Sequence, residues 1–306
     1  MKIIKGGVTA PQGFLASGIH CGLKKSKKDL ALLYSHLICD AAAVYTSNRV
    51  KGEPLYVTMQ HLKNGKAQAV IINSGNANTC TGEEGREKAL KMTQLVASEA
   101  NIDPTDVVVA STGVIGIPLP IKKIEKKIPE LVKNKSIEGH KDAREAILTT
   151  DLHTKEIAVS IRIDEKEVKI GGMAKGSGMI HPNMATMLSF LTTDIHIEQS
   201  LLQEALHDTV EKSYNRISVD GDTSTNDMVT ILASGMAGNN KIIDKDENYQ
   251  AFVHALQFIN TYLAKEIARD GEGATKLVEC IVNGATNEKS AVKLAKSVIS
   301  SSLVKT

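Results

Sequence analysis

The sequence has no tryptophan, and only 3% of its 306 residues are aromatic. It also lacks an excess of either charge, with 37 Lys and Arg against 35 Asp and Glu and a formal net charge of +2. Binding to nucleic acid through phosphate contacts and base stacking needs basic residues in excess and aromatic faces. The composition therefore argues against nucleic acid as the main partner. A hydrophobic content of 42% and a charged content of 24% are typical of a globular protein.

Long apolar runs are missing as well. No stretch of about 18 uncharged apolar residues, the length that spans a membrane, occurs. The most apolar region, residues 30–46, is interrupted by His36 and Asp40. The first seven residues lack the apolar core of a signal peptide. We therefore expect no membrane partner, and we expect a cytoplasmic protein.

Cysteine is scarce, and the four cysteines are far apart in the sequence: Cys21, Cys39, Cys80 and Cys280. They form no Cys-x-x-Cys pair, and no histidine stands near them at the spacing of a metal site. We therefore expect four buried or incidental thiols in a reducing compartment, and no bound metal.

Apolar patterns predict the secondary structure, with short apolar runs as strands and a 3.6-residue apolar period as helices. The expected strands cover 14–23, 30–37, 41–46, 67–72, 106–110, 157–163, 168–171, 187–191, 228–233 and 276–282. The expected helices cover 83–100, 197–212, 251–268 and 287–304, the last capped by Asn287. Because strands come in groups separated by helices, layered sheets covered by helices are favoured over a strictly alternating parallel sheet.

Two lysine-rich stretches, 24–28 and 122–127, have acidic residues beside or within them. They are expected to be a solvated loop and a solvated helix face.

The segment 171–190 carries the strongest chemical signal. It combines several glycines with Lys175 and the pair Pro182-Asn183, and it runs directly into an apolar strand. A phosphate-binding P-loop needs Gly-Lys followed by Ser or Thr at the start of a helix. Here Lys175 precedes Gly176 and a strand follows, so the P-loop pattern is not met.

A different interpretation of this segment begins with a tight turn at 181–183, which is followed by Ala185-Thr186. A strained peptide there would place the Thr186 hydroxyl against the Ala185 carbonyl, and attack would convert the amide into an ester that water cleaves. The new chain would begin with Thr186, whose α-amine has a reference pKa of about 7.7–8.0 and is a ready general base. Without further context, Ala-Thr before a strand indicates only a half-buried β-branched residue.

Residues 175–188, KGSGMIHPNMATML, closely resemble the self-cleavage signature of the glutamate N-acetyltransferase (ornithine acetyltransferase) family of arginine biosynthesis. The resemblance extends in order to residues 7–14, 73–78, 111–116, 218–227 and 269–276. It implies an α/β fold of the α+β type, with a layered αββα sandwich like that of the self-cleaving aminopeptidases and a smaller α/β domain. It further implies an α fragment, 1–185, and a β fragment, 186–306, assembled as a heterotetramer with two copies of each.

The family resemblance also implies the chemistry. An acetyl group passes from N-acetylornithine to Thr186, and glutamate then takes it in a ping-pong reaction without a bound cofactor. In bifunctional members acetyl-CoA is a further donor. The implied site residues are Thr186 with Ala185 for cleavage, Thr186 with Thr112 and Gly113 for catalysis, and Thr150, Lys175, Thr186 and Glu272 for substrate binding.

The polar loops 73–78 and 220–227 lie next to expected strands. Asp220, Asp222 and Ser224 alternate as in a calcium loop, but glycine at the sixth position and glutamate at the twelfth are missing. We expect these loops to shape the site through hydrogen bonds.

Family members continue past the residue that corresponds to Thr306, and the additional segment supplies an Asn and a terminal Thr to the pocket. The β fragment is therefore expected to be shorter than in the family. Two alternative functions stay open: an inactive remnant or binding subunit, and an amide hydrolase on the same scaffold.

Overall fold

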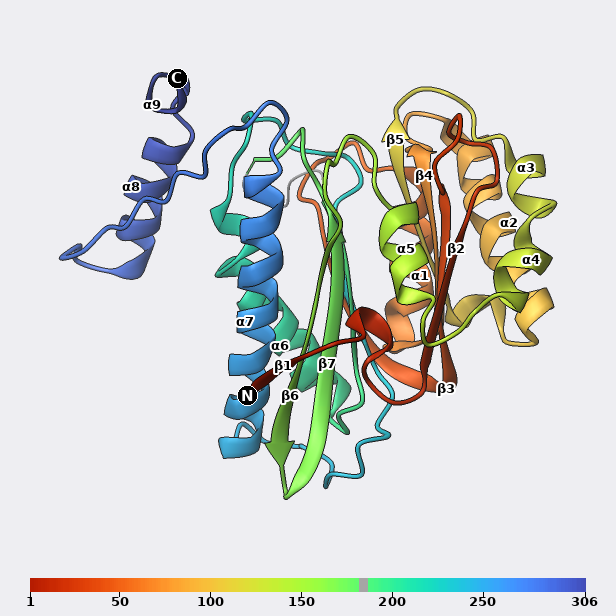
Figure 1. Cartoon of the computed structure of the whole chain (residues 1–306), viewed down its shortest axis with the longest axis horizontal. Helices are drawn as coiled ribbons and strands as arrows, with labels where there is room; N and C mark the ends of the chain where they lie inside the picture. The colour runs from red at the N-terminus through yellow and green to blue at the C-terminus, as the bar shows by residue number, and fades with distance from the viewer. Residues whose placement is uncertain (182–186) are drawn as a thin grey trace.

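The computed structural model describes residues 1–181 and 187–306. In this part of the chain nine strands form one sheet in the order β1-β6-β7-β8-β9-β3-β4-β5, with β2 also paired to β3 (Figure 1). The strands are β1 (Lys2–Ile4), β2 (Phe14–Ile19), β3 (Leu30–Tyr45), β4 (Lys66–Asn76), β5 (Val107–Val114), β6 (Lys155–Ile163), β7 (Lys166–Lys175), β8 (Leu188–Thr193) and β9 (Met228–Ala233).

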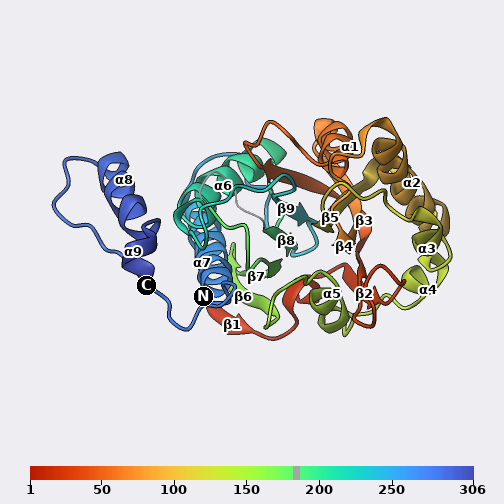
Figure 2. The same cartoon turned by 90° about the horizontal axis from the view of Figure 1, so that it is seen from above.

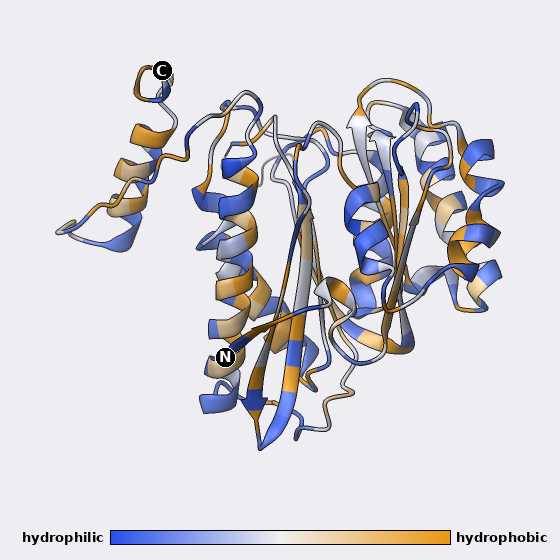
Figure 3. Ribbon diagram, in the orientation of Figure 1, coloured by the Kyte–Doolittle hydropathy of each residue, from blue (hydrophilic) through white to orange (hydrophobic). Residues whose placement is uncertain are grey.

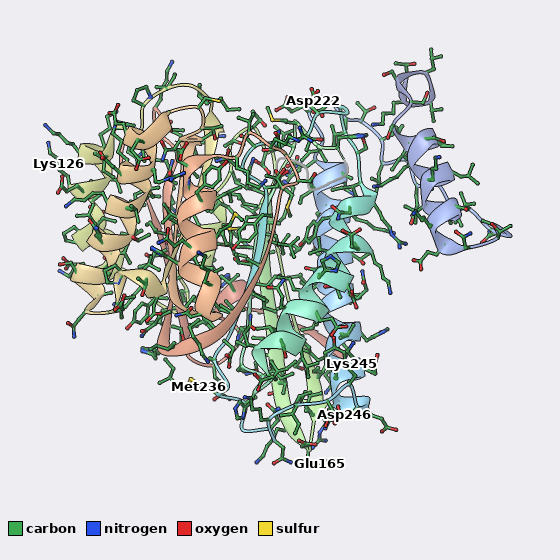
Figure 4. The ribbon with its side chains drawn as sticks, turned by 180° about the vertical axis from the view of Figure 1, so that it is seen from behind. Lys126, Glu165, Asp222, Met236, Lys245 and Asp246 are labelled. Carbon is green, nitrogen blue, oxygen red and sulfur yellow. The ribbon has the colours of Figure 1, made fainter. Side chains whose placement is uncertain are left out.

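Most of the helices pack against this sheet. The helices are α1 (Glu53–His61), α2 (Gly82–Ala100), α3 (Ile121–Glu125), α4 (Ile128–Lys133), α5 (His140–Ala146), α6 (Gln199–Glu211), α7 (Glu247–Arg269), α8 (Glu288–Ile299) and α9 (Ser302–Lys305). Helix α7 begins where the Asp246 carboxylate accepts the Tyr249 amide at 2.9 Å, a side-chain N-cap. Figure 4 labels Asp222 at the upper edge of the molecule and Asp246 near its lower edge.

Strand β3 joins two layers of the fold. Its first half pairs with β2 and β4, and its last six residues pair with β9. The pairing with β4 is irregular between Tyr34 and Cys39, where Leu37 and Ile38 are exposed. A β-bulge bends a strand and increases its twist. Sequence patterning predicts two strands here, 30–37 and 41–46, whereas the structure has one long bent strand.

The two halves of the bent sheet enclose a common core. Phe14 and Val70 from one half and Met173 and Phe190 from the other belong to the same buried cluster. A second cluster joins β6–β9 to α6 and α7, and a third joins β3–β5 to α2, α3 and α4. Figure 2 shows these layers from above, and Figure 3 shows that α7 alternates between hydrophobic and hydrophilic stripes. The expected αββα sandwich is confirmed.

Most expected elements are present with boundaries shifted by a few residues, but one is wrong. Residues 276–282 form an exposed loop instead of a strand. Leu277, Val278 and Ile281 carry the apolar pattern, yet they are exposed and no neighbouring strand in the described residues pairs with this loop. A strand needs a partner for its backbone groups. Sequence patterning did not predict the short elements β1, α1, α4 and α5, because a short helix or strand contains too few residues to show a clear apolar period.

The last expected helix, 287–304, divides into α8 and α9 at Ser300 and Ser301. Its start is confirmed, because Asn287 Oδ1 accepts the Ser290 amide at 2.9 Å. Figure 1 shows α8 and α9 standing away from the two layers. Among the described residues, no helix is long and apolar enough to span a membrane.

Phe190, which is fully buried on β8, tests the core between the layers. Phe190→Ala is expected to lower the free energy of unfolding by about 3–5 kcal/mol, because the ring leaves a cavity that the stiff sheets cannot close. Urea denaturation measures this loss. Ile243→Ala, at a residue that is 65% exposed, is the control and should change stability by less than about 0.5 kcal/mol. Equal losses for the two variants would contradict the assignment of the core.

Candidate active site

The expected cleavage residues, Ala185 and Thr186, lie outside the described residues, so the candidate site is built from what surrounds them. Met187, the next residue, is buried, and its amide donates to Asp227 Oδ1 at 2.9 Å. Lys175 at the end of β7 pairs with Leu188 at the start of β8. The antiparallel pair β7–β8 therefore brings Lys175 beside the start of β8, two residues after the expected nucleophile.

Thr112 lies next to Lys175. The ends of the parallel strands β4 and β5 place Ser74 opposite Thr112 and Gly75 opposite Gly113. The Lys175 ammonium donates to Thr112 Oγ1 at 3.5 Å, and the two residues are 2% and 3% exposed. The structure thus brings together two site residues that are 63 positions apart in the sequence.

Gly113 occupies a position that only glycine tolerates. Its φ is +133°, and a Cβ there would lie 2.4 Å from the carbonyl carbon of Gly75. Because L side chains disfavour this backbone region and the clash is with backbone, any larger residue must push β4 and β5 apart. The glycine permits close approach of the two strand ends beside Thr112.

Lys175 is a buried cation in an acidic neighbourhood. Burial lowers the pKa of its ammonium, while the charges of Asp151, Asp227 and Glu272 act in the opposite direction. A cation in this position can bind a carboxylate or stabilise a developing negative charge.

Asp227 was missed as an individual residue by sequence analysis. Its carboxyl is fully buried, and Oδ2 has no hydrogen-bond partner among the described residues. Burial raises its pKa well above the usual range, although the Met187 amide, Ser224 and Lys175 favour the ionised form. Its position could be inferred only as part of the 220–227 loop.

The two polar loops make the expected hydrogen bonds. The Asn226 amide donates to the carbonyl oxygens of Ala77 at 2.7 Å and Ser111 at 3.0 Å, which ties the 220–227 loop to the residue before Thr112. The Asp220 carboxylate accepts a hydrogen bond from the amide of Ile180 at 2.9 Å, five residues before Ala185 in the sequence. The expected hydrogen bonds are present, although residues 73–76 belong to β4 and are not a loop; that these segments shape the site stays a prediction.

Thr150 and Glu272 reach the same region on exposed loops. Glu272 follows α7, and its amide donates to Ser177 O at 3.1 Å. A Cβ on Gly178 would lie 2.6 Å from the Glu272 carboxyl, so glycine lets this carboxylate approach the cleavage segment. Glu272 also lines a cavity of about 810 Å³ between α7 and α8. Thr150 is exposed and directly precedes Asp151, which binds the Gly176 amide at 2.7 Å.

Lys24 corrects the expectation that residues 24–28 form a fully solvated loop. Its ammonium donates to the carbonyl oxygens of Lys28 at 2.8 Å and Leu148 at 2.5 Å. Burial lowers its pKa to about 8, and Asp29 opposes this effect. Because Leu148 follows α5 by two residues, the hydrogen bond to Leu148 holds the lysine against the chain that leaves the helix. By contrast, Lys122 and Lys123 lie exposed on α3, as expected.

Asp151 makes stability sensitive to acid. Burial would raise its pKa, but the charges of Lys175 and Lys155 outweigh burial and lower the value to about 2 from 3.8. Its contribution to stability is therefore present above pH 3.8 and is lost as the pH falls towards 2. The difference in urea midpoint between the wild type and Asp151→Asn is expected to be constant from pH 7 to about 5 and to shrink below it. A difference that does not change with pH would contradict this prediction.

Comparison with known proteins places the chain in a family. The model of the ArgJ family matches residues 15–306. The arginine biosynthesis bifunctional protein ArgJ of Caldanaerobacter subterraneus subsp. tengcongensis is 50% identical over 306 residues, which are all of this chain and 76% of that protein. ArgJ of Symbiobacterium thermophilum is 51% identical over 308 residues, covering all of this chain and 77% of that protein.

Solved structures agree with this match. The crystal structure of ArgJ from Bacillus halodurans has a TM-score of 0.58 and 45% identity, and covers 60% of this chain and 97% of its own. Ornithine acetyltransferase from Mycobacterium tuberculosis, complexed with ornithine, has a TM-score of 0.55 and 36% identity, and the match covers 59% of this chain and 97% of that chain. An aminopeptidase from Ochrobactrum anthropi, described as a variant of the Ntn hydrolase fold, shares the fold at 12% identity and a TM-score of 0.54. The family model spans nearly all of the sequence, and half of the residues are identical to those of known members, so this chain belongs to the ArgJ family.

Proposed function

We propose that this chain is an acetyltransferase of arginine biosynthesis that transfers the acetyl group of N-acetylornithine to glutamate. The observation that carries the proposal is the contact between Lys175 and Thr112 beside the strand that follows Thr186. This contact supports Thr112 as part of an oxyanion hole and Lys175 as a carboxylate-binding cation, both beside the nucleophile Thr186. Family membership and the ornithine bound to the Mycobacterium tuberculosis relative support the substrate class.

The first reaction in the proposal is self-cleavage. The Thr186 hydroxyl attacks the Ala185 carbonyl carbon, the peptide C–N bond breaks, and Thr186 acquires a free α-amine. Water then hydrolyses the ester and leaves the Ala185 carboxylate. The two ArgJ-family crystal chains support the resulting fragments 1–185 and 186–306. Each is matched over 97% of its own length but only 60% or 59% of this chain, so each is about as long as residues 1–185.

Acetyl transfer follows as two half-reactions. The α-amine of Thr186 takes the proton from its own hydroxyl as the oxygen attacks the acetyl carbonyl. The Gly113 amide and the Thr112 hydroxyl donate to the tetrahedral oxyanion. Because Thr112 Oγ1 accepts a hydrogen bond from the Lys175 ammonium, the proton of the Thr112 hydroxyl can be donated to the oxyanion. The amide C–N bond breaks, and ornithine leaves with the proton that the α-amine held. The glutamate amine then attacks the ester carbonyl of acetyl-Thr186, the ester C–O bond breaks, and the α-amine passes the proton of the glutamate amine to Thr186 Oγ1. N-acetylglutamate leaves, and free Thr186 is restored.

Substrate recognition uses the polar groups around this centre. Both substrates are amino-acid derivatives with a carboxylate, which Lys175 can bind, and ornithine has an ammonium, which Glu272 can bind. Thr150 adds a hydroxyl at the edge of the same region. The family resemblance supports acetyl-CoA as a second donor, a heterotetramer of two α and two β fragments, and a cytoplasmic location.

The test is to purify the protein, determine its fragments by intact mass and N-terminal sequencing, and incubate it with N-acetylornithine and glutamate. We expect two fragments, the second beginning at Thr186, and N-acetylglutamate as product. Acetate released without glutamate would identify an amide hydrolase instead. Neither cleavage nor product would identify a binding subunit or inactive remnant and overturn the proposal.

A further inference from the structure

A buried ion cluster lies beside the site and has no role in the reaction described above. The Lys155 ammonium at the start of β6 donates to Asp151 Oδ1 at 2.8 Å and to Asp270 Oδ2 at 2.5 Å. The side chains of Asp151, Lys155 and Asp270 are 0%, 1% and 3% exposed. We call these three residues the buried triad.

The carboxylates of the buried triad also accept hydrogen bonds from backbone amides of two separate segments, the loop 149–153 and the residue after β7. Asp151 accepts the amide of Gly176 at 2.7 Å, and its other oxygen accepts the amide of Thr149 at 3.0 Å. Asp270 accepts the amides of Leu152 at 3.1 Å and His153 at 3.3 Å. The loop 149–153, the end of β7 and the end of α7 are therefore held to one another.

Each of these segments carries one expected substrate-binding residue. Thr150 lies between Thr149 and Asp151, Lys175 precedes Gly176, and Glu272 follows Asp270 by two positions. None of the three triad side chains is accessible to a substrate. They act on the pocket through the backbone that they hold.

The buried triad has a net negative charge that faces a cation of the candidate site. Two carboxylates and one ammonium leave one negative charge, and the charge of buried Lys175 acts on Asp151. Burying ions costs desolvation energy, and replacing a buried ion pair with apolar residues is often neutral or stabilising. Stability alone is therefore a weak reason for such a cluster, whereas directional bonds to four amides restrict the geometry.

We propose that Asp151, Lys155 and Asp270 form a positioning unit that sets the relative placement of Thr150, Lys175 and Glu272 in the substrate pocket. The inference rests on the proposed function. Asp151 and Lys155 precede the cleavage point and Asp270 follows it, so after cleavage the triad is also a buried tie between the α and β fragments.

Asp270→Asn and Lys155→Met test the inference in the full-length, self-cleaved protein. Asp270→Asn keeps the size of the side chain and an oxygen for the amides but removes the charge that faces Lys155. We expect normal self-cleavage, and a rise in KM for N-acetylornithine and in the Kd of ornithine by about 10- to 100-fold, with a smaller change in kcat. Lys265→Met is the control, because Lys265 also lies on α7 but pairs with Glu279 at the surface.

The second measurement follows the association of the fragments by native mass spectrometry as urea is increased. We expect both triad variants to dissociate at lower urea than the wild type and the Lys265→Met control. A double variant, Lys155→Met with Asp270→Asn, should lose less than the sum of the single variants, because it leaves fewer unpaired charges.

The outcomes separate this inference from the proposed function. If the wild type transfers acetyl and the folded, cleaved variants bind ornithine as the wild type does, the positioning unit is refuted and the proposed function stands. If the wild type neither transfers acetyl nor binds ornithine, the proposed function fails and the positioning inference, which rests on it, fails with it. Equal urea dependence of dissociation in all variants would refute the tie between the fragments.

Discussion

Thr186→Ala is expected to yield a single uncut chain whose acetyl transfer is lower by several orders of magnitude. Alanine has no oxygen to attack the Ala185 carbonyl, so the peptide bond stays intact and no free α-amine forms. The same substitution removes the acetyl acceptor, so both reactions are lost together. A denaturing gel and intact mass report cleavage, and N-acetylglutamate formation reports transfer.

The matched control is Thr186→Ser, which keeps a hydroxyl at the same position. We expect this variant to cleave and to transfer acetyl, more slowly than the wild type because the serine hydroxyl samples more rotamers than the β-branched threonine hydroxyl. A cleaved Thr186→Ala chain, or an uncut wild type with full activity, would show that residue 186 is not the cleavage nucleophile.

Thr112→Val is expected to lower kcat by about 10²–10³-fold, equivalent to about 2.7–4 kcal/mol, with a smaller effect on KM. Valine matches the shape of threonine but has no hydroxyl to donate to the oxyanion. It also removes the acceptor that the Lys175 ammonium uses at 3.5 Å. Steady-state kinetics with both substrates separate the two parameters.

Thr58→Val is the control for the loss of a buried hydroxyl. Thr58 on α1 is also fully buried, and its hydroxyl donates to the Val109 carbonyl of β5 at 2.7 Å. We expect this variant to lose stability without a selective loss of kcat. If the two variants lower kcat equally, packing around β5 and not an oxyanion donor explains the effect. Gly113→Ala is less informative, because the added Cβ lies 2.4 Å from the backbone of Gly75 and displaces the strand.

Local patterns predicted most of the strands and helices of this protein. An apolar period shows which face of a helix or strand is buried, and this pattern lies within the sequence of the element itself. The predicted helices at 83–100, 197–212 and 251–268 and the strand at Met228–Ala233 are examples. The same reasoning failed at 276–282, a short apolar run with which no strand in the described residues pairs.

The residues of the candidate site were found through motifs, whereas their supporting side chains were not. Lys175 and Thr112 stand in conspicuous segments rich in glycine and hydroxyl residues, and Asp227 ends another such segment. Lys155 and Asp151 have no such context. In a chain with 72 charged Lys, Arg, Asp and Glu residues, nothing local distinguishes a buried ion from a solvated one.

The sequence by itself determined the family, the cleavage signature and the set of polar residues available for chemistry, because these depend on residue type and spacing. Tertiary structure decided how they meet. A bend in β3 folds one sheet into two facing layers, and Lys155 contacts Asp270 across 115 positions. Such contacts depend on pairing between strands and helices that are distant in the chain, and an ion is held in the interior only where that pairing supplies its partners.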